Sequence, residues 1–238
     1  MTSRRAFVDS FNALLTRRFV DGKNALCWPR ALPGDFSEVA RLLAPSEGVV
    51  VVTAEDLAAL SLSAAGRIAA DVMCTDLQRL EALGKEPLLN CIAGYPRDDS
   101  GAAVVTDVMS FHVDRAPVEV DTFLCTYFGA PSEGLDNDDA VLRVLEPEVR
   151  AALLAEWRNS GDDRGDDRGR LREEADAFDS FLAEHSYDLH YRAVDSAQPW
   201  SFGVGALWKI AVQWPGARVP PCIHRAPDST APRLLLIC

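Results

Sequence analysis

Segments with the residue pattern of β-strands fall into two blocks of this 238-residue chain, and a largely helical stretch separates them. In the first block, residues 118–128 alternate between two sides, as a half-buried strand does. In the second block, residues 201–214 alternate in the same way, and short strands are expected at 219–224 and 233–238. Strands this far apart in sequence share a core when they close one antiparallel sheet or barrel. The chain is therefore predicted to be an α+β protein.

The remaining segments predict one domain, which suits a chain of 26.0 kDa. Residues 1–85 are expected to be mostly helical, and residues 86–135 and 200–238 are expected to form the β core. Residues 136–190 predict a helical insert between the two blocks of strands. Within the insert, the repeated GDDR of residues 161–170 is typical of a flexible, solvated acidic loop.

Three local patterns stand out within the first 85 residues. Apolar residues recur with helical spacing over residues 3–20, which predicts an amphipathic helix there. The run Val49–Val52 predicts a short buried strand. Thr53 follows as an expected helix N-cap, with Asp56 three positions later as its capping-box partner.

The charge balance argues against one large class of partner. Lys and Arg total 24 against 36 Asp and Glu, a formal net charge of −12, whereas nucleic-acid binding needs clustered cations. No apolar run approaches the roughly 18 residues of a membrane span. The first residues lack the pattern of a secretory signal, so we expect a cytoplasmic location and no membrane partner. None of the six cysteines forms a CxxC pair, and we expect them to be free thiols.

The chain has only four histidines, and two of them lie in a pattern that suits a metal. In a strand, residues i and i+2 point to the same side, so His112 and Asp114 can both aim into the mouth of a barrel. His224 from a later strand would complete a group of two imidazoles and one carboxylate, which suits non-haem Fe(II). Two alternatives stay open: separate hydrogen-bonded histidines, or a closed zinc site that includes Cys222.

Several other side chains are candidates for binding an anionic molecule beside that metal. Arg233 follows His224 by nine residues, across a turn, and can form a bidentate pair with a carboxylate. Lys209 lies within an apolar strand, where an inward-facing charge would need a bound anion; the alternative is a solvent-facing side chain. Further candidate donors are the hydroxyl groups of Ser229, Thr230 and Tyr127, although Tyr127 also suits core packing.

The pattern HVD…H…R resembles the iron(II)/2-oxoglutarate-dependent oxygenase superfamily, whose core is a double-stranded β-helix. The segments FHVD…TYFGAPSE, LWKIAVQWPG and IHRAP…RLLL are similar, more closely, to an uncharacterised bacterial domain family. In that family, FHxD precedes TYxGxGTEW, and KGxxW precedes HRSP. The similarity covers roughly residues 105–135 and 200–238, and Ile210 departs from it by standing where the family has glycine.

The resemblance implies a double-stranded β-helix (jelly-roll or cupin-like) core and an Fe(II)/2-oxoglutarate-dependent dioxygenase. His112, Asp114 and His224 would be the iron ligands, Arg233 would hold the distal carboxylate of 2-oxoglutarate, and dioxygen would oxidise a small-molecule substrate. A cupin-like protein that handles zinc or iron without oxygenase activity is the alternative. A third hypothesis is an interaction module that uses the acidic insert. His185 and His190 are expected to be structural or surface residues.

Overall fold

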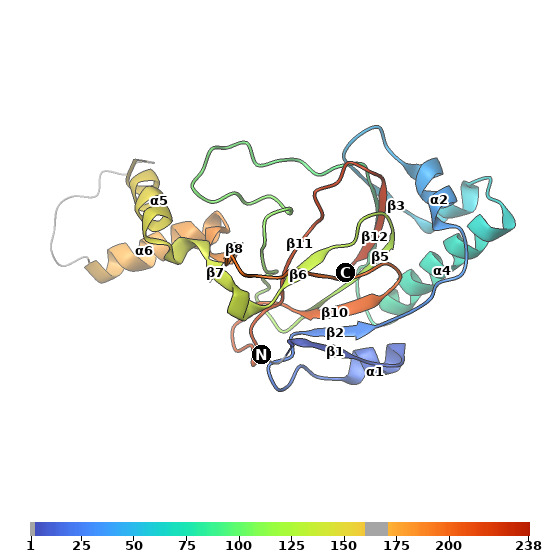
Figure 1. Cartoon of the computed structure of the whole chain (residues 1–238), viewed down its shortest axis with the longest axis horizontal. Coiled ribbons are helices and arrows are strands. Elements are labelled where there is room, and N and C mark those ends of the chain that lie inside the picture. Colours follow the sequence, from blue (N-terminus) through green and yellow to red (C-terminus); the bar gives the residue numbers. More distant parts are fainter. Residues whose placement is uncertain (1–2, 160–170) are drawn as a thin grey trace.

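A computed structural model describes residues 3–159 and 171–238 (Figure 1). The acidic loop predicted at 161–170 therefore lies outside the described residues. The largest element is a seven-stranded sheet in which all neighbours are antiparallel except the first pair. In spatial order its strands are β1 (Arg5–Phe7), β2 (Ala25–Trp28), β10 (Leu207–Ala211), β5 (Asp121–Phe128), β12 (Arg233–Ile237), β4 (Leu88–Ile92) and β3 (Val49–Val52).

A small antiparallel sheet packs on one face of the large sheet. Its strands, in spatial order, are β11 (Ile223–Arg225), β6 (Glu133–Leu135) and β9 (Trp200–Ser201). Between the two sheets, Trp200 and Phe202 share a buried apolar cluster with Leu124 of β5 and Trp208 of β10. A further pair of strands, β7 (Ala140–Leu142) and β8 (Tyr191–Ala193), extends from this end of the fold. The predicted α+β class is confirmed, and the sheets do not close into a barrel.

Helices cover the opposite face of the large sheet. This layer contains α1 (Phe11–Thr16), α2 (Phe36–Leu43), α3 (Ala54–Ala59) and α4 (Ala64–Glu81). Figure 1 shows the predicted helical insert, α5 (Pro147–Asn159) and α6 (Leu171–Glu184), at the end of the molecule away from α2 and α4. Short 3₁₀ turns at Asn137–Asp139, Arg143–Leu145 and Tyr187–Leu189 join the insert to its flanking strands. The insert has an apolar cluster of its own.

Strand β5 runs through the middle of the large sheet and divides its side chains between the two layers. Leu124 packs in the cluster between the sheets, whereas Phe123 and Cys125 pack in the cluster beneath the helices. Because strand side chains alternate, Thr122 and Thr126 lie on the same face as Leu124. We call this side of the large sheet the inter-sheet face and the other side the helix face.

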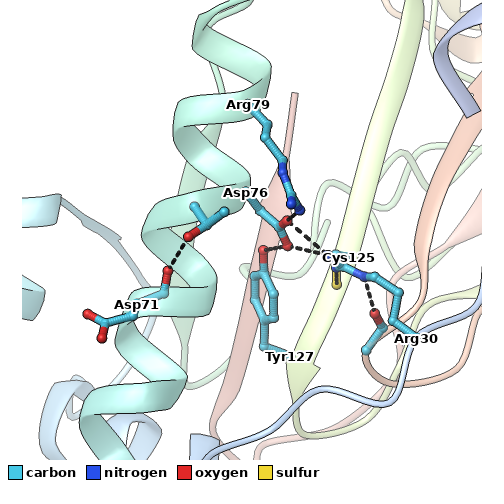
Figure 2. A network of polar contacts seen from close by, with 8 residues as sticks. Arg30, Asp71, Asp76, Arg79, Cys125 and Tyr127 are labelled. Atoms are coloured by element: carbon cyan, nitrogen blue, oxygen red, sulfur yellow. Dashed lines mark hydrogen bonds and ion pairs between the residues drawn. The ribbon is translucent and has the colours of Figure 1, made fainter. Parts of the chain in front are cut away.

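A buried ion pair ties α4 to the helix face (Figure 2). Arg30 donates to both carboxylate oxygens of Asp76, at 2.8 and 2.7 Å, and the Tyr127 hydroxyl donates to Asp76 Oδ2 at 2.8 Å. A second nitrogen of Arg30 contacts Cys125 Sγ at 3.3 Å. We call these four residues the helix-face network. It joins the loop after β2, helix α4 and strand β5.

The first 85 residues contain more β structure than predicted. The predicted helix over 3–20 is wrong in its first turns, because Arg5–Phe7 pairs in parallel with β2 and only Phe11–Thr16 is helical. Long-range strand pairing here overrides the local helical periodicity. In all, this region supplies three of the seven strands, so the β core extends beyond its predicted boundaries. The capping box of Thr53 and Asp56 is confirmed at the start of α3.

Strand β3 forms at the predicted position but is not buried. It lies at the edge of the large sheet and pairs only with β4. Val49, Val50 and Val51 are each about half exposed, and only Val52 is buried. Four consecutive valines are typical of a strand covered on both faces, but this edge has no such cover. In the part of the chain that the structure describes, no helix is long and apolar enough to cross a membrane.

Candidate metal centre

The segment around His112 crosses the space beside the small sheet and is held there by backbone bonds. The amide of His112 donates to the carbonyl of His224 at 2.9 Å, and the amide of His224 donates back to His112 at the same distance. On the other side, the amide of Val113 donates to the carbonyl of Leu189 at 3.1 Å. His112 therefore joins strand β11 on one side and the end of the helical insert on the other.

The structure brings His112, Asp114 and His224 together. One ligand atom from each residue lies within 4.8 Å of the other two, a spacing that can hold one metal ion. His224 Nε2 lies 3.9 Å from Asp114 Oδ1, and the two imidazole ring centres are 4.7 Å apart. His224 is buried, while His112 and Asp114 are half-buried. We call these three residues the metal group.

Hydrogen bonds orient each member of the metal group. His112 Nδ1 lies 2.8 Å from the carbonyl of Ser110, and His224 Nδ1 lies 3.2 Å from the carbonyl of Cys222. A carbonyl can only accept, so each Nδ1 carries a proton and Nε2 is the ring nitrogen available to a metal. The Thr122 hydroxyl donates to Asp114 Oδ2 at 2.6 Å and leaves Oδ1 free. Metal-ligating histidines usually have such a partner on their second nitrogen.

His112 is held in the neutral form that a metal requires. Burial lowers the pKa of His112 to about 4, with a smaller contribution from the neighbouring His224. A neutral imidazole near pH 7 offers its lone pair without first losing a proton.

Arg233 lies on the inter-sheet face and is almost fully buried, at 3% exposed. Its side chain contacts three neutral hydroxyls: Tyr95 at 2.9 Å, Thr126 at 3.0 Å and Ser132 at 2.7 Å. Its Nε is buried without a partner, and no carboxylate among the described residues lies within ion-pair distance. Burial lowers the pKa of Arg233 below its usual value, against the smaller, opposite effect of Tyr95. The guanidinium nevertheless stays charged.

Lys209 and Tyr127 were candidate binding residues, but the structure does not bring them to the metal group. Lys209 lies on the helix face, where Nζ donates to the carbonyls of Leu15 at 3.2 Å and Arg17 at 2.8 Å. Tyr127 also lies on the helix face, bound to Asp76. The alternation along each strand separates both from the inter-sheet face.

Ser229 and Thr230 lie in the turn between β11 and β12. Neither hydroxyl accepts a hydrogen bond from Arg233 in the described structure. The amide of Ser229 instead bonds to the carbonyl of Pro227 at 3.1 Å, and its hydroxyl accepts from the amide of Ala231 at 3.2 Å. The Ser229 hydroxyl therefore stabilises the turn itself.

Sequence reasoning missed the residues that surround these groups. Tyr95 and Ser132 hold Arg233 but lie in loops whose path no local pattern predicts. His190, expected to be structural or on the surface, is buried and outside the metal group; its Nδ1 lies 2.8 Å from the carbonyl of Ser186, and its ring centre lies 5.8 Å from that of His112. Cys222 is not a member of the metal group; its thiol contacts the carbonyl of Ile223 instead. The only sequence feature that made His190 a candidate is that the chain has just four histidines.

Comparisons with protein-family models, with curated proteins and with solved structures find no match to this chain. The case for a function therefore depends on the geometry of the metal group and of Arg233.

Proposed function

We propose that this protein is a non-haem Fe(II)/2-oxoglutarate-dependent oxygenase that oxidises a small molecule, with the two sheets as a jelly-roll core. One observation carries the proposal: a three-residue metal group and a buried arginine without an internal carboxylate lie against the same face of one sheet. The first suits a metal that keeps open positions, and the second suits an anion that arrives from outside.

The donor set fits iron. Two imidazole Nε2 atoms and one carboxylate oxygen are the ligands of the facial arrangement in non-haem Fe(II) oxygenases, which leaves positions for a co-substrate and dioxygen. When bound, the iron with 2-oxoglutarate and dioxygen supplies an oxidant strong enough to take a hydrogen atom from a carbon of the substrate. The protein holds the ligands: Ser110 and Cys222 fix the imidazole rings, and Thr122 fixes the Asp114 carboxylate.

The placement of Arg233 fits the far carboxylate of the same co-substrate. Thr122 contacts Asp114 and Thr126 contacts Arg233, both from the inter-sheet face of β5. Thr122 and Thr126 are four residues apart, which is about 13 Å between backbone positions along a strand. A short dicarboxylate can then be held at one end by the metal and at the other by the guanidinium. The three hydroxyls around Arg233 accept both hydrogens of Nη2 and one of Nη1, which orients the guanidinium and leaves its Nε–H and one Nη1–H for an anion.

The same donors also suit zinc, so a cupin-like metal-handling protein is the competing function. The oxygenase and the metal-handling protein differ in the role of Arg233. Only the oxygenase gives a buried cation without a carboxylate partner a ligand to bind. Binding of 2-oxoglutarate therefore separates them.

The test measures metal content, 2-oxoglutarate affinity and succinate release in the same preparation under controlled oxygen. We expect iron-dependent binding of 2-oxoglutarate, and succinate release that falls to background in His112→Ala. His185→Ala is the matched control, because His185 lies in the helical insert and bonds to the carbonyl of Phe181. Stoichiometric zinc without 2-oxoglutarate binding would establish the metal-handling alternative. Succinate release that survives His112→Ala would exclude the proposed metal group.

A further inference from the structure

Trp200 carries a buried hydrogen-bond donor that the chain does not satisfy. The residue is only 8% exposed, and its indole Nε1 has no partner among the described residues. A buried tryptophan N–H normally finds an acceptor, because leaving it unpaired costs the desolvation of that group. The neighbouring Trp208 follows this rule: its Nε1 donates to the carbonyl of Phe202 at 2.6 Å.

The register of the small sheet places Trp200 beside the metal group. Gly134 of β6 lies directly opposite His224 on one side and opposite Trp200 on the other. Residues directly opposite in an antiparallel pair share a face, so the side chains of His224 and Trp200 flank the same glycine. Both then face the large sheet.

The indole covers the position where Gly134 lacks a side chain. A methyl group added at Gly134 would lie 2.2 Å from Cζ2 and 2.4 Å from Cε2 of Trp200. Cε2 is bonded to Nε1, so the donor end of the indole lies over the glycine that separates Trp200 from His224. The glycine is needed here for space, since its absent side chain leaves room for the ring.

Neighbouring groups hold the indole in this orientation. Its ring centre lies 4.4 Å from that of Phe202 and 5.2 Å from that of Trp208, and the Arg5 guanidinium lies 4.8 Å from the ring. The Phe202 ring in turn lies 6.4 Å from the ring of His224. The N–H is therefore held in a fixed orientation over Gly134, on the face of the small sheet that carries His224.

We infer that the indole N–H of Trp200 donates to an oxygen of 2-oxoglutarate bound between the sheets. This inference rests on the proposed function and adds a binding residue to it. Trp200 Nε1 and Arg233 Nε are both buried donors without a partner in the described structure. Under this inference, bound 2-oxoglutarate accepts a hydrogen bond from each of them.

The test compares Trp200→Phe with Trp208→Phe in the full-length protein loaded with Zn²⁺ in place of iron, by calorimetric titration with 2-oxoglutarate. Both variants keep an aromatic ring in the same cluster, but only the first removes an unpaired N–H. We expect about tenfold weaker binding for Trp200→Phe, and affinity within about twofold of the unsubstituted protein for Trp208→Phe. Zinc affinity should stay unchanged in both.

A second measurement on the unsubstituted protein guards against poor folding of either variant. The indole ¹⁵N–¹H resonance that disappears in Trp200→Phe should shift downfield when 2-oxoglutarate is added, and that of Trp208 should not. An unshifted Trp200 resonance during saturable binding would overturn the inference and leave the proposed function standing. Absence of any 2-oxoglutarate binding by the unsubstituted, metal-loaded protein would overturn both.

Discussion

Two buried arginines lie on opposite faces of one sheet, and they are satisfied in opposite ways. On the helix face, Arg30 Nη1 donates to both oxygens of the Asp76 carboxylate, at 2.8 and 2.7 Å. On the inter-sheet face, Arg233 has only neutral hydroxyls around it and an unpaired Nε. Burying a charge is costly unless it is paired. The chain supplies the counter-charge of Arg30, whereas none of the described carboxylates pairs with Arg233, which is the basis for proposing that it binds an anion.

The pKa shifts follow the same division. Burial opposes the charged form of Arg30, but the Cys125 sulfur and the Asp76 carboxylate outweigh it and raise the pKa. For Arg233, burial is the largest effect and lowers the pKa. The counter-charge of Arg30 comes from within the chain, which suits a structural role. Arg233 has no such counter-charge among the described residues, which suits a role in binding a ligand.

The largest effect should come from removing the internal counter-charge. Asp76→Ala leaves Arg30 buried without a carboxylate, and we expect a loss of about 3–5 kcal/mol in the free energy of unfolding, measured in urea. Arg30→Met with Asp76→Ala should restore part of that loss. A loss below about 1 kcal/mol in Asp76→Ala would mean that buried Arg30 does not need the carboxylate for stability. The two arginines would then not differ in this respect.

Replacing the other arginine should separate binding from stability. Arg233→Met removes the cation that is proposed to hold the far carboxylate, and we expect 2-oxoglutarate affinity to fall by about 2–5 kcal/mol. Stability in urea should stay within about 1 kcal/mol or rise, because no internal ion pair is lost. A stability loss as large as that of Asp76→Ala would remove the contrast between the two faces.

Acid should weaken the inter-sheet region through His112. Its pKa is about 4 in the folded protein against 6.5 for the ordinary group, so the unfolded chain binds more protons between these values. Stability should therefore fall as the pH drops from 6.5 to about 4, by at most about 3 kcal/mol. His112→Asn should flatten this part of the stability profile, measured by urea unfolding at each pH. An unchanged profile would mean that His112 titrates alike in both states.

The smallest effect should come from the edge of the helix-face network. Tyr127→Phe removes one hydrogen bond to Asp76 Oδ2, which still has the Arg30 contact, so we expect a loss of about 1 kcal/mol in unfolding free energy. The affinity for 2-oxoglutarate should not change, since Tyr127 lies on the helix face. A measurable change in that affinity would show that the two faces are coupled through β5.

The sequence predicted those parts of the fold that depend on the pattern of neighbouring residues along the chain. The alternation of residues 118–128 predicts β5, and the spacing of His112 and Asp114 predicts that they share a side. Which side of a strand faces a site is decided by the other layers, however. The alternation of β10 places Lys209 opposite Trp208, but only the assembled sheets show that the Trp208 side faces the metal group.

Long-range contacts explain the remaining misses. The hydroxyls that surround Arg233 were not predicted, because Tyr95 and Ser132 lie 138 and 101 residues away from it along the chain. Trp200 gave no signal in the sequence, because its importance depends on a glycine in another strand. A single sequence does not indicate which distant residues will become neighbours.

Strand β5 serves both arginines at once, and this limits how its length can vary. Thr126 binds Arg233 from one face, while Cys125 contacts Arg30 from the other. Substitution can change one such contact and leave the other. Insertion or deletion of a single residue within β5 would exchange the two faces, and so would remove the Thr126 and Cys125 contacts in one event. Strand β5 should therefore tolerate substitutions better than a change in its number of residues.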